Sequence, residues 1–122
     1  MSKKILLVDD EESLVVLLGE RLKFNGYEVI TASDGQEGLD KAKKEKPDLI
    51  LLDVMMPKMN GYQVCRLLKF DQRFKHIPII MLTARTQAID MKTGKETGAD
   101  AYITKPFESD VLLNEMKKLL KE

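Results

Sequence analysis

The sequence predicts an α/β fold: a doubly wound, five-stranded parallel sheet with five helices. Five short apolar runs recur along the chain, and the segments between them are long enough for a helix. Four of these runs are continuous or rich in β-branched residues, as is typical of strands buried on both faces. Alternating strands and helices favour a parallel sheet that right-handed crossovers cover on both faces. The expected strands are residues 5–8, 27–31, 49–52, 79–82 and 101–104.

The first two helices are marked by side-chain spacing and by a capping residue. Leu14, Leu18 and Leu22 recur at the spacing of one helix face after the first expected strand. Either Ser33 or Asp34 can cap the second helix, because short polar side chains bond the free amides of a first turn.

The remaining three helices are marked less evenly. The third is expected to begin at Asn60-Gly61. The fourth, between Arg85 and Gly98, has few apolar anchors and contains Gly94, which costs about 1 kcal/mol relative to alanine. Composition leaves open whether that helix is simply solvated or is the part that moves. The apolar positions are Val64, Cys65 and Leu68 in the third helix, Ala88, Ile89 and Met91 in the fourth, and Leu112, Met116, Leu119 and Leu120 in the last.

Length and composition are those of one domain. The 122 residues are 43% hydrophobic, and 20 basic residues balance 20 acidic ones, so net charge draws the chain toward neither nucleic acid nor a membrane. The single cysteine excludes an internal disulfide and fits a reducing compartment. No apolar run approaches the ~20 residues of a membrane span. We therefore expect one cytoplasmic domain over residues 1–122, with no output domain in this chain and no direct contact with nucleic acid or a membrane.

Carboxylates stand at the ends of two expected strands. Asp9 and Asp10 end the first strand and Asp53 ends the third. Because the carboxyl ends of parallel strands share one edge, we expect these acids to meet in one pocket. Two adjacent carboxylates repel each other, and a cation such as Mg²⁺, which prefers oxygen ligands, relieves that repulsion. Glu11 and Glu12 are better explained as acids in a first helical turn.

Asp53 is a candidate nucleophile. Alone it could simply cap a turn, but beside two other acids and a cation it could form an aspartyl phosphate. The Thr83 hydroxyl and the Ala84 amide can donate to a phosphoryl oxygen, and the Lys105 ammonium can neutralise its charge. Pro106 leaves open whether the preceding peptide bond is cis or trans.

These residues and their spacing resemble the response-regulator receiver domains of two-component signalling, in particular the single-domain chemotaxis and sporulation regulators. The resemblance covers essentially all 122 residues in order and spacing. It implies the flavodoxin-like receiver fold, with strand order 2-1-3-4-5. The matching segments are Asp9-Asp10, residues 51–61 around Asp53, Thr83-Ala84, and residues 98–107 around Lys105.

The resemblance also implies a role for each residue. Asp53 would accept a phosphoryl group from a sensor histidine kinase or a phosphotransfer protein. Asp10 would ligate Mg²⁺ directly and Asp9 directly or through water, with Asp53 and the Met55 carbonyl completing the protein ligands. Thr83, Ala84 and Lys105 would bind the phosphoryl oxygens, Thr83 and Tyr102 would form the switch, and Met55 and Arg85 would tune the lifetime of the phosphorylated state.

The implied function is a phosphorylation-dependent signalling switch rather than an enzyme. The protein would assist its own Mg²⁺-dependent phosphorylation and dephosphorylation within a phosphorelay. The change would reach a downstream protein through the face formed by the fourth helix, fifth strand and fifth helix. The domain would be a monomer or a weak, phosphorylation-dependent dimer.

Three other functions compete with this one. A haloacid-dehalogenase-like phosphatase needs an acid two residues after the nucleophile, where this chain has Met55. A flavin or nucleotide binder needs a loop that cradles phosphate after the first strand, where residues 9–12 are all acidic. A degenerate receiver, acting as a phosphorylation-independent interaction module, stays open although every chemical position is intact.

Two positions depart from the family pattern: Lys95 replaces a usual apolar residue, and Gly38 replaces a frequent alanine at a small cost in helix propensity.

Overall fold

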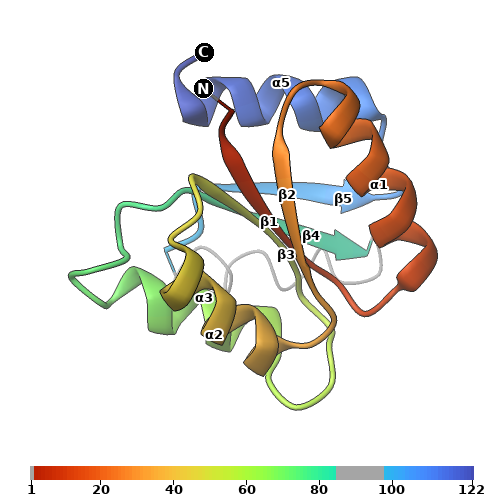
Figure 1. Cartoon of the computed structure of the whole chain (residues 1–122). Coiled ribbons are helices and arrows are strands. Elements are labelled where there is room, and N and C mark those ends of the chain that lie inside the picture. The colour runs from red at the N-terminus through yellow and green to blue at the C-terminus, as the bar shows by residue number, and fades with distance from the viewer. Residues whose placement is uncertain (1, 85–97) are drawn as a thin grey trace.

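Five parallel strands form one sheet in the order β2-β1-β3-β4-β5 (Figure 1). The computed structural model describes residues 2–84 and 98–122. The predicted α/β class and the strand order that the resemblance implies are both confirmed. The elements are β1 (Lys4–Val8), α1 (Glu12–Phe24), β2 (Glu28–Ala32), α2 (Gly35–Glu45), β3 (Leu49–Asp53), α3 (Gly61–Lys69), β4 (Ile79–Ala84), β5 (Ala101–Lys105) and α5 (Ser109–Leu120).

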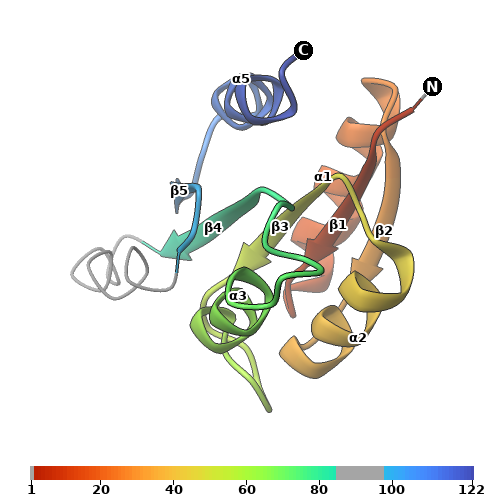
Figure 2. The same ribbon diagram turned by 90° about the vertical axis from the view of Figure 1, so that its left-hand side faces the viewer.

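The sheet has a separate apolar core on each face. Successive side chains of a strand point to opposite faces, so Leu6 and Val8 pack with α2 and α3, whereas Ile5 and Leu7 pack with α1 and α5. All four are fully buried. Figure 2 shows α5 on one side of the sheet and α2 and α3 on the other. Burial on both faces explains why these strands are continuous apolar runs.

The helices on the α2 and α3 side begin at specific caps. Of the two candidates for α2, Asp34 is the cap, and its carboxylate accepts a hydrogen bond from the Glu37 amide at 2.8 Å. Asn60 and Gln63 form a reciprocal capping box at the start of α3. A Cβ placed on Gly61 would lie 2.2 Å from the Asp53 carbonyl oxygen, so only glycine lets α3 begin this close to the end of β3. The start of α3 therefore rests directly against the residue that ends β3.

The structure leaves one expectation untested and corrects two others. The sequence predicts five helices, and the described residues contain four; the fourth expected helix, between Arg85 and Gly98, lies outside the described residues, as do Gly94 and Lys95. β4 runs through Ala84, so Thr83 lies within the strand rather than after it. Gly38 does more than lower the helix propensity of α2. It also allows close packing, because a Cβ there would lie 2.8 Å from a Val8 methyl carbon. The apolar anchors expected for the fourth helix, Ala88, Ile89 and Met91, lie outside the described residues too.

Over residues 2–84 and 98–122, no helix has both the length and the apolar character that crossing a membrane requires.

Candidate functional site

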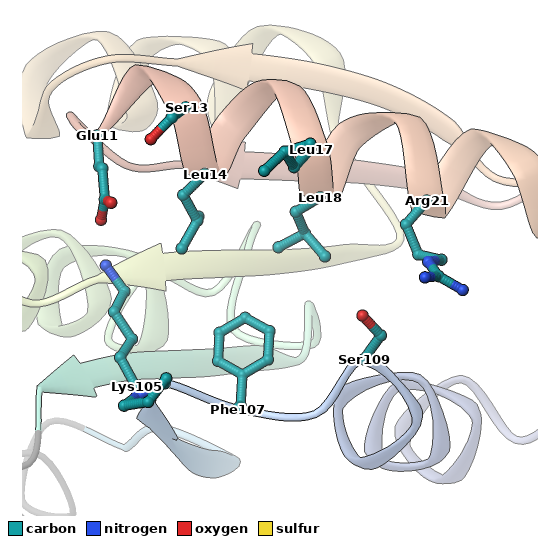
Figure 3. Close-up of a pocket in the computed structure, with 10 residues that line it drawn as sticks. Glu11, Ser13, Leu14, Leu17, Leu18, Arg21, Lys105, Phe107 and Ser109 are labelled. Atoms are coloured by element: carbon teal, nitrogen blue, oxygen red, sulfur yellow. The ribbon is translucent and has the colours of Figure 1, made fainter.

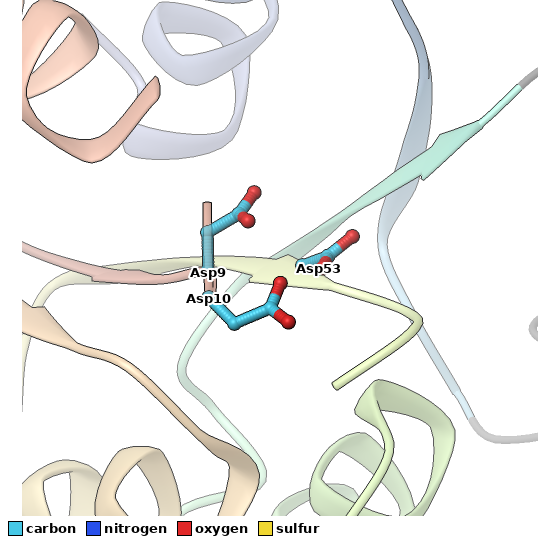
Figure 4. Close-up of side chains that lie close together, drawn as sticks. All are labelled: Asp9, Asp10 and Asp53. Atoms are coloured by element: carbon cyan, nitrogen blue, oxygen red, sulfur yellow. The ribbon is translucent and has the colours of Figure 1, made fainter. Parts of the chain in front are cut away.

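Three acids meet where β1 and β3 end. Val8 and Leu52 are register partners, so the next residues along each strand, Asp9 and Asp53, lie side by side at the carboxyl edge. One carboxylate oxygen from each of Asp9, Asp10 and Asp53 lies within 4.8 Å of the other two (Figure 4). The predicted convergence is therefore confirmed, and the open parallel sheet is its cause.

The three acids differ in exposure. Asp9 and Asp53 are 1% and 6% exposed, whereas Asp10 lies at the surface. A donor set made only of carboxylate oxygens, closed on one side and open to solvent on the other, suits Mg²⁺, which keeps several water ligands. The chemistry of the donor set thus fits a magnesium ion. Met55 follows in the loop after β3, and its side chain is 61% exposed.

Lys105 connects the two buried acids. Its ammonium lies 2.7 Å from Asp9 Oδ2 and 3.2 Å from Asp53 Oδ1. The second oxygen of Asp9 accepts a hydrogen bond from the Glu11 amide at 2.9 Å, so Asp9 is held at both oxygens. Burial alone would lower the pKa of Lys105, but the hydrogen bond to Asp9 and the charges of both carboxylates raise it above its ordinary value. Lys105 therefore stays charged and offsets part of the local negative charge.

The environment of Asp53 destabilises the ionised form of its carboxyl group. Burial, and then the charge of Asp9, raise the pKa of Asp53 from 3.8 to about 6, although Lys105 opposes the shift. A carboxylate with this pKa is mostly ionised at neutral pH yet destabilised, as is common for groups that react. The raised pKa therefore means that the ionised form of Asp53 is destabilised in this site.

Thr83 and Ala84 lie at the same edge, beside β5. Their register partners are Thr104 and Lys105, which brings Ala84 next to the lysine that contacts the acids. The Thr83 side chain is 1% exposed, and its hydroxyl donates to the Ala84 carbonyl over 3.3 Å. These two residues therefore end β4, the strand between β3, which carries Asp53, and β5, which carries Lys105. Arg85, expected to tune lifetime, lies outside the described residues.

Tyr102 lies on β5 and packs against the core beneath α3. Its hydroxyl oxygen is buried and has no hydrogen-bond partner among the described residues. Burial raises the pKa of Tyr102 to about 12, with smaller contributions from Cys65 and Tyr62. Tyr102 precedes Thr104 by two residues on β5, the strand that also carries Lys105. Its hydroxyl group is therefore buried inside the protein, close in sequence to the site.

No motif in the sequence predicts the groove that lies beside the acids. It lies between α1 and the start of α5, with a volume of about 700 Å³, and Lys105 stands at one end (Figure 3). Leu14, Leu17 and Phe107 contribute much of its apolar lining, and Leu17 is 73% exposed. One signal was present: residues 14–18 are apolar without a break, so α1 has apolar side chains on more than one face.

The fold and the site define the class of protein, a receiver domain of two-component signalling. The chain belongs to the response regulator receiver domain family, whose sequence model matches residues 5–117.

The relatives agree in sequence and in structure. The chain is 53% identical over 121 residues to the alkaline phosphatase synthesis transcriptional regulatory protein PhoP of Bacillus subtilis, covering 99% of this chain and 50% of that protein. It is 37% identical to the chemotaxis response regulator CheY4 of Vibrio cholerae, with a TM-score of 0.90, covering 98% and 99% of the two chains. The receiver domain of the sensor histidine kinase PA1611 from Pseudomonas aeruginosa, solved with magnesium in its active-site cleft, is 27% identical, with a TM-score of 0.91 and full coverage of both chains. The chain thus spans about half the length of PhoP.

Proposed function

We propose that this protein is a phosphorylation-dependent switch in which Asp53 accepts a phosphoryl group with the help of Mg²⁺. The observation that carries the proposal is the cluster itself: a buried Asp53 with a raised pKa, two further acids within 4.8 Å, and a lysine 3.2 Å away. Each group supplies something that phosphoryl transfer needs: a nucleophile, a metal site and a positive charge.

The transfer makes one bond and breaks another. An oxygen of Asp53 bonds to phosphorus while the bond from phosphorus to the donor nitrogen breaks, and that nitrogen keeps the electron pair. Asp9, Asp10, Asp53 and the Met55 carbonyl would hold Mg²⁺, which neutralises charge on the transferring group when bound. The Lys105 ammonium, the Thr83 hydroxyl and the Ala84 amide would bind the phosphoryl oxygens. Met55 and Arg85 would tune how fast water removes the group.

The donor is a sensor histidine kinase or a phosphotransfer protein. The apolar groove between α1 and α5 supports a protein donor, because it opens beside Lys105 and one of its lining residues, Leu17, is 73% exposed. Contiguous exposed apolar surface commonly marks a protein interface. A donor docked there would have its reactive side chain near the acids.

The output passes from Thr83 and Tyr102 to a face formed by β5, α5 and the expected fourth helix, which lies outside the described residues, and this face contacts a downstream protein. Thr83 pairs with Thr104, two residues after Tyr102, so a movement of Thr83 toward the phosphoryl group acts on the same strand pair. The domain, residues 1–122, acts as a monomer or a weak phosphorylation-dependent dimer.

The proposal is tested by labelling with acetyl phosphate and with a panel of histidine kinases, with and without Mg²⁺. We expect one acid-labile, hydroxylamine-sensitive phosphoryl group per chain, dependent on Mg²⁺ and mapped to Asp53. A protein that binds Mg²⁺ but takes no label would instead be a phosphorylation-independent interaction module.

A first prediction concerns the ionisation of Asp53. In metal-free protein we expect its side-chain carboxyl carbon to titrate near pH 6 by NMR, and the midpoint to move lower as Mg²⁺ is added, because a cation favours the charged form. Since the folded-state pKa lies above the unfolded value of 3.8, the charge lowers stability above about pH 6, and this cost disappears as the pH falls toward 4. A midpoint near 4 without metal would contradict the assigned environment.

A second prediction concerns Asp10, the exposed acid of the cluster. Replacing it with alanine removes one of three carboxylate ligands, and we expect the Kd for Mg²⁺, measured by titration calorimetry, to rise at least about tenfold. Its exposure means that the fold should be retained. Glu12→Ala, in the first turn of α1, is the matched control and should change the Kd by about twofold or less. Equal affinity in Asp10→Ala and the wild type would remove Asp10 from the metal site.

A further inference from the structure

A tight turn in the loop between β3 and α3 has an unfavourable backbone conformation. Lys58 has a φ of 70°, in the left-handed region that residues other than glycine rarely adopt. The Met59 amide donates to the Pro57 carbonyl at 2.8 Å and closes a three-residue turn around Lys58. Strained backbone of this kind persists only where the surrounding structure fixes it.

The first turn of α2 supplies that fixation through two contacts. Gly35 packs so closely against Met59 that an added Cβ would lie 1.9 Å from the Met59 carbonyl oxygen and 2.7 Å from its carbonyl carbon. No L side chain fits at this position without moving backbone. Asp34, the cap of α2, forms an ion pair with Lys58 over 3.4 Å. One contact therefore acts on the backbone of the turn and the other on its side chain.

The same loop is attached to the acidic site at both ends. The Val54 amide donates to the Leu82 carbonyl at 3.2 Å, directly after Asp53. At the other end, the Gly61 amide donates to the Val54 carbonyl at 2.8 Å, and Gly61 abuts the Asp53 carbonyl. Met55 lies between these anchors. A displacement of the turn at residues 57–59 thus has few ways to relax without moving Met55.

We propose that Gly35 and Asp34 are positioning residues for the magnesium site, holding residues 54–60 in the conformation in which the Met55 carbonyl serves as a ligand. The inference rests on the proposed function, which assigns that carbonyl to the ion. It adds a dependence that the acids alone do not have: metal affinity is controlled by the start of α2, which itself contributes no ligand.

The decisive experiment uses Gly35→Ala in the full chain, with Gly38→Ala as its matched control. Both substitutions place a Cβ in tight contact from the same helix, but Gly38 meets a Val8 methyl carbon at 2.8 Å rather than the loop backbone. We expect Gly35→Ala to raise the Kd for Mg²⁺ at least tenfold and to speed amide hydrogen exchange in residues 54–61. Gly38→Ala should leave the Kd within twofold of the wild type. Thermal unfolding of both variants records any loss of stability separately.

Lys58→Gly provides a second test that does not depend on a buried substitution. Lys58 is exposed and glycine accepts its positive φ, so this variant should fold while losing the ion pair to Asp34. We expect about a threefold rise in the Kd for Mg²⁺. Wild-type affinity in both Gly35→Ala and Lys58→Gly would overturn the inference and leave the proposed function intact. A wild-type protein that binds no Mg²⁺ would instead overturn the proposed function itself.

Discussion

Asp53→Asn is expected to abolish phosphoryl acceptance while keeping the fold. The amide has nearly the shape of the carboxyl group, but its nitrogen and oxygen are too weakly nucleophilic to form an acyl phosphate. Intact-protein mass spectrometry after treatment with acetyl phosphate and Mg²⁺ should show no added phosphoryl group. The loss should be complete rather than partial, because the amide has no ionised oxygen to attack phosphorus.

The same substitution should raise stability in metal-free protein at neutral pH. Burial and Asp9 raise the pKa of Asp53 to about 6, so its charge opposes folding there, and a neutral amide removes that cost. Because the cluster is open to water, we expect a gain of only about 1 kcal/mol in the free energy of unfolding, vanishing near pH 4. Asp40→Asn, exposed on α2, is the control and should keep full labelling. Hydroxylamine-sensitive label in Asp53→Asn would place the acceptor elsewhere.

Lys105→Ala is expected to separate phosphorylation from its structural consequence. The ammonium contacts both buried acids, so removing it leaves two carboxylates without that positive partner. In metal-free protein we expect a loss of about 2 kcal/mol in the free energy of unfolding by urea, below the full cost of breaking a buried pair because the site opens to solvent. Added Mg²⁺ should recover much of the loss, since the cation supplies the missing charge.

Metal binding by Lys105→Ala should stay equal to the wild type or become tighter, because ammonium and cation compete for the same oxygens. Phosphorylation should still occur, but the amide chemical shifts of β5 and α5 should respond far less than in the wild type. A full wild-type response of those shifts would show that Lys105 does not couple the site to the switch. Lys118→Ala, whose ion pair to Glu115 is exposed, is the control and should change the free energy of unfolding by about 0.5 kcal/mol or less.

Much of the site followed from the sequence because parallel topology constrains it strongly. Apolar runs that end in Asp9, Asp53 and Lys105 must bring those residues to one edge once the strands are parallel. The order of the strands, and the roles of Met55 and Tyr102, came from the resemblance and not from any pattern in the residues.

Sequence alone determined the α/β class, the sites of most strands and helices, and the acids that converge, because burial and strand ends are encoded locally by hydrophobic periodicity. Only the tertiary structure decided how charge is shared, with Lys105 closer to Asp9 than to Asp53 and the raised pKa falling on Asp53. It also decided that α2 and α3 pack closely against the loop after β3 at Gly35 and Gly61. These features depend on distances between atoms brought together by packing, and no spacing along the chain reports them.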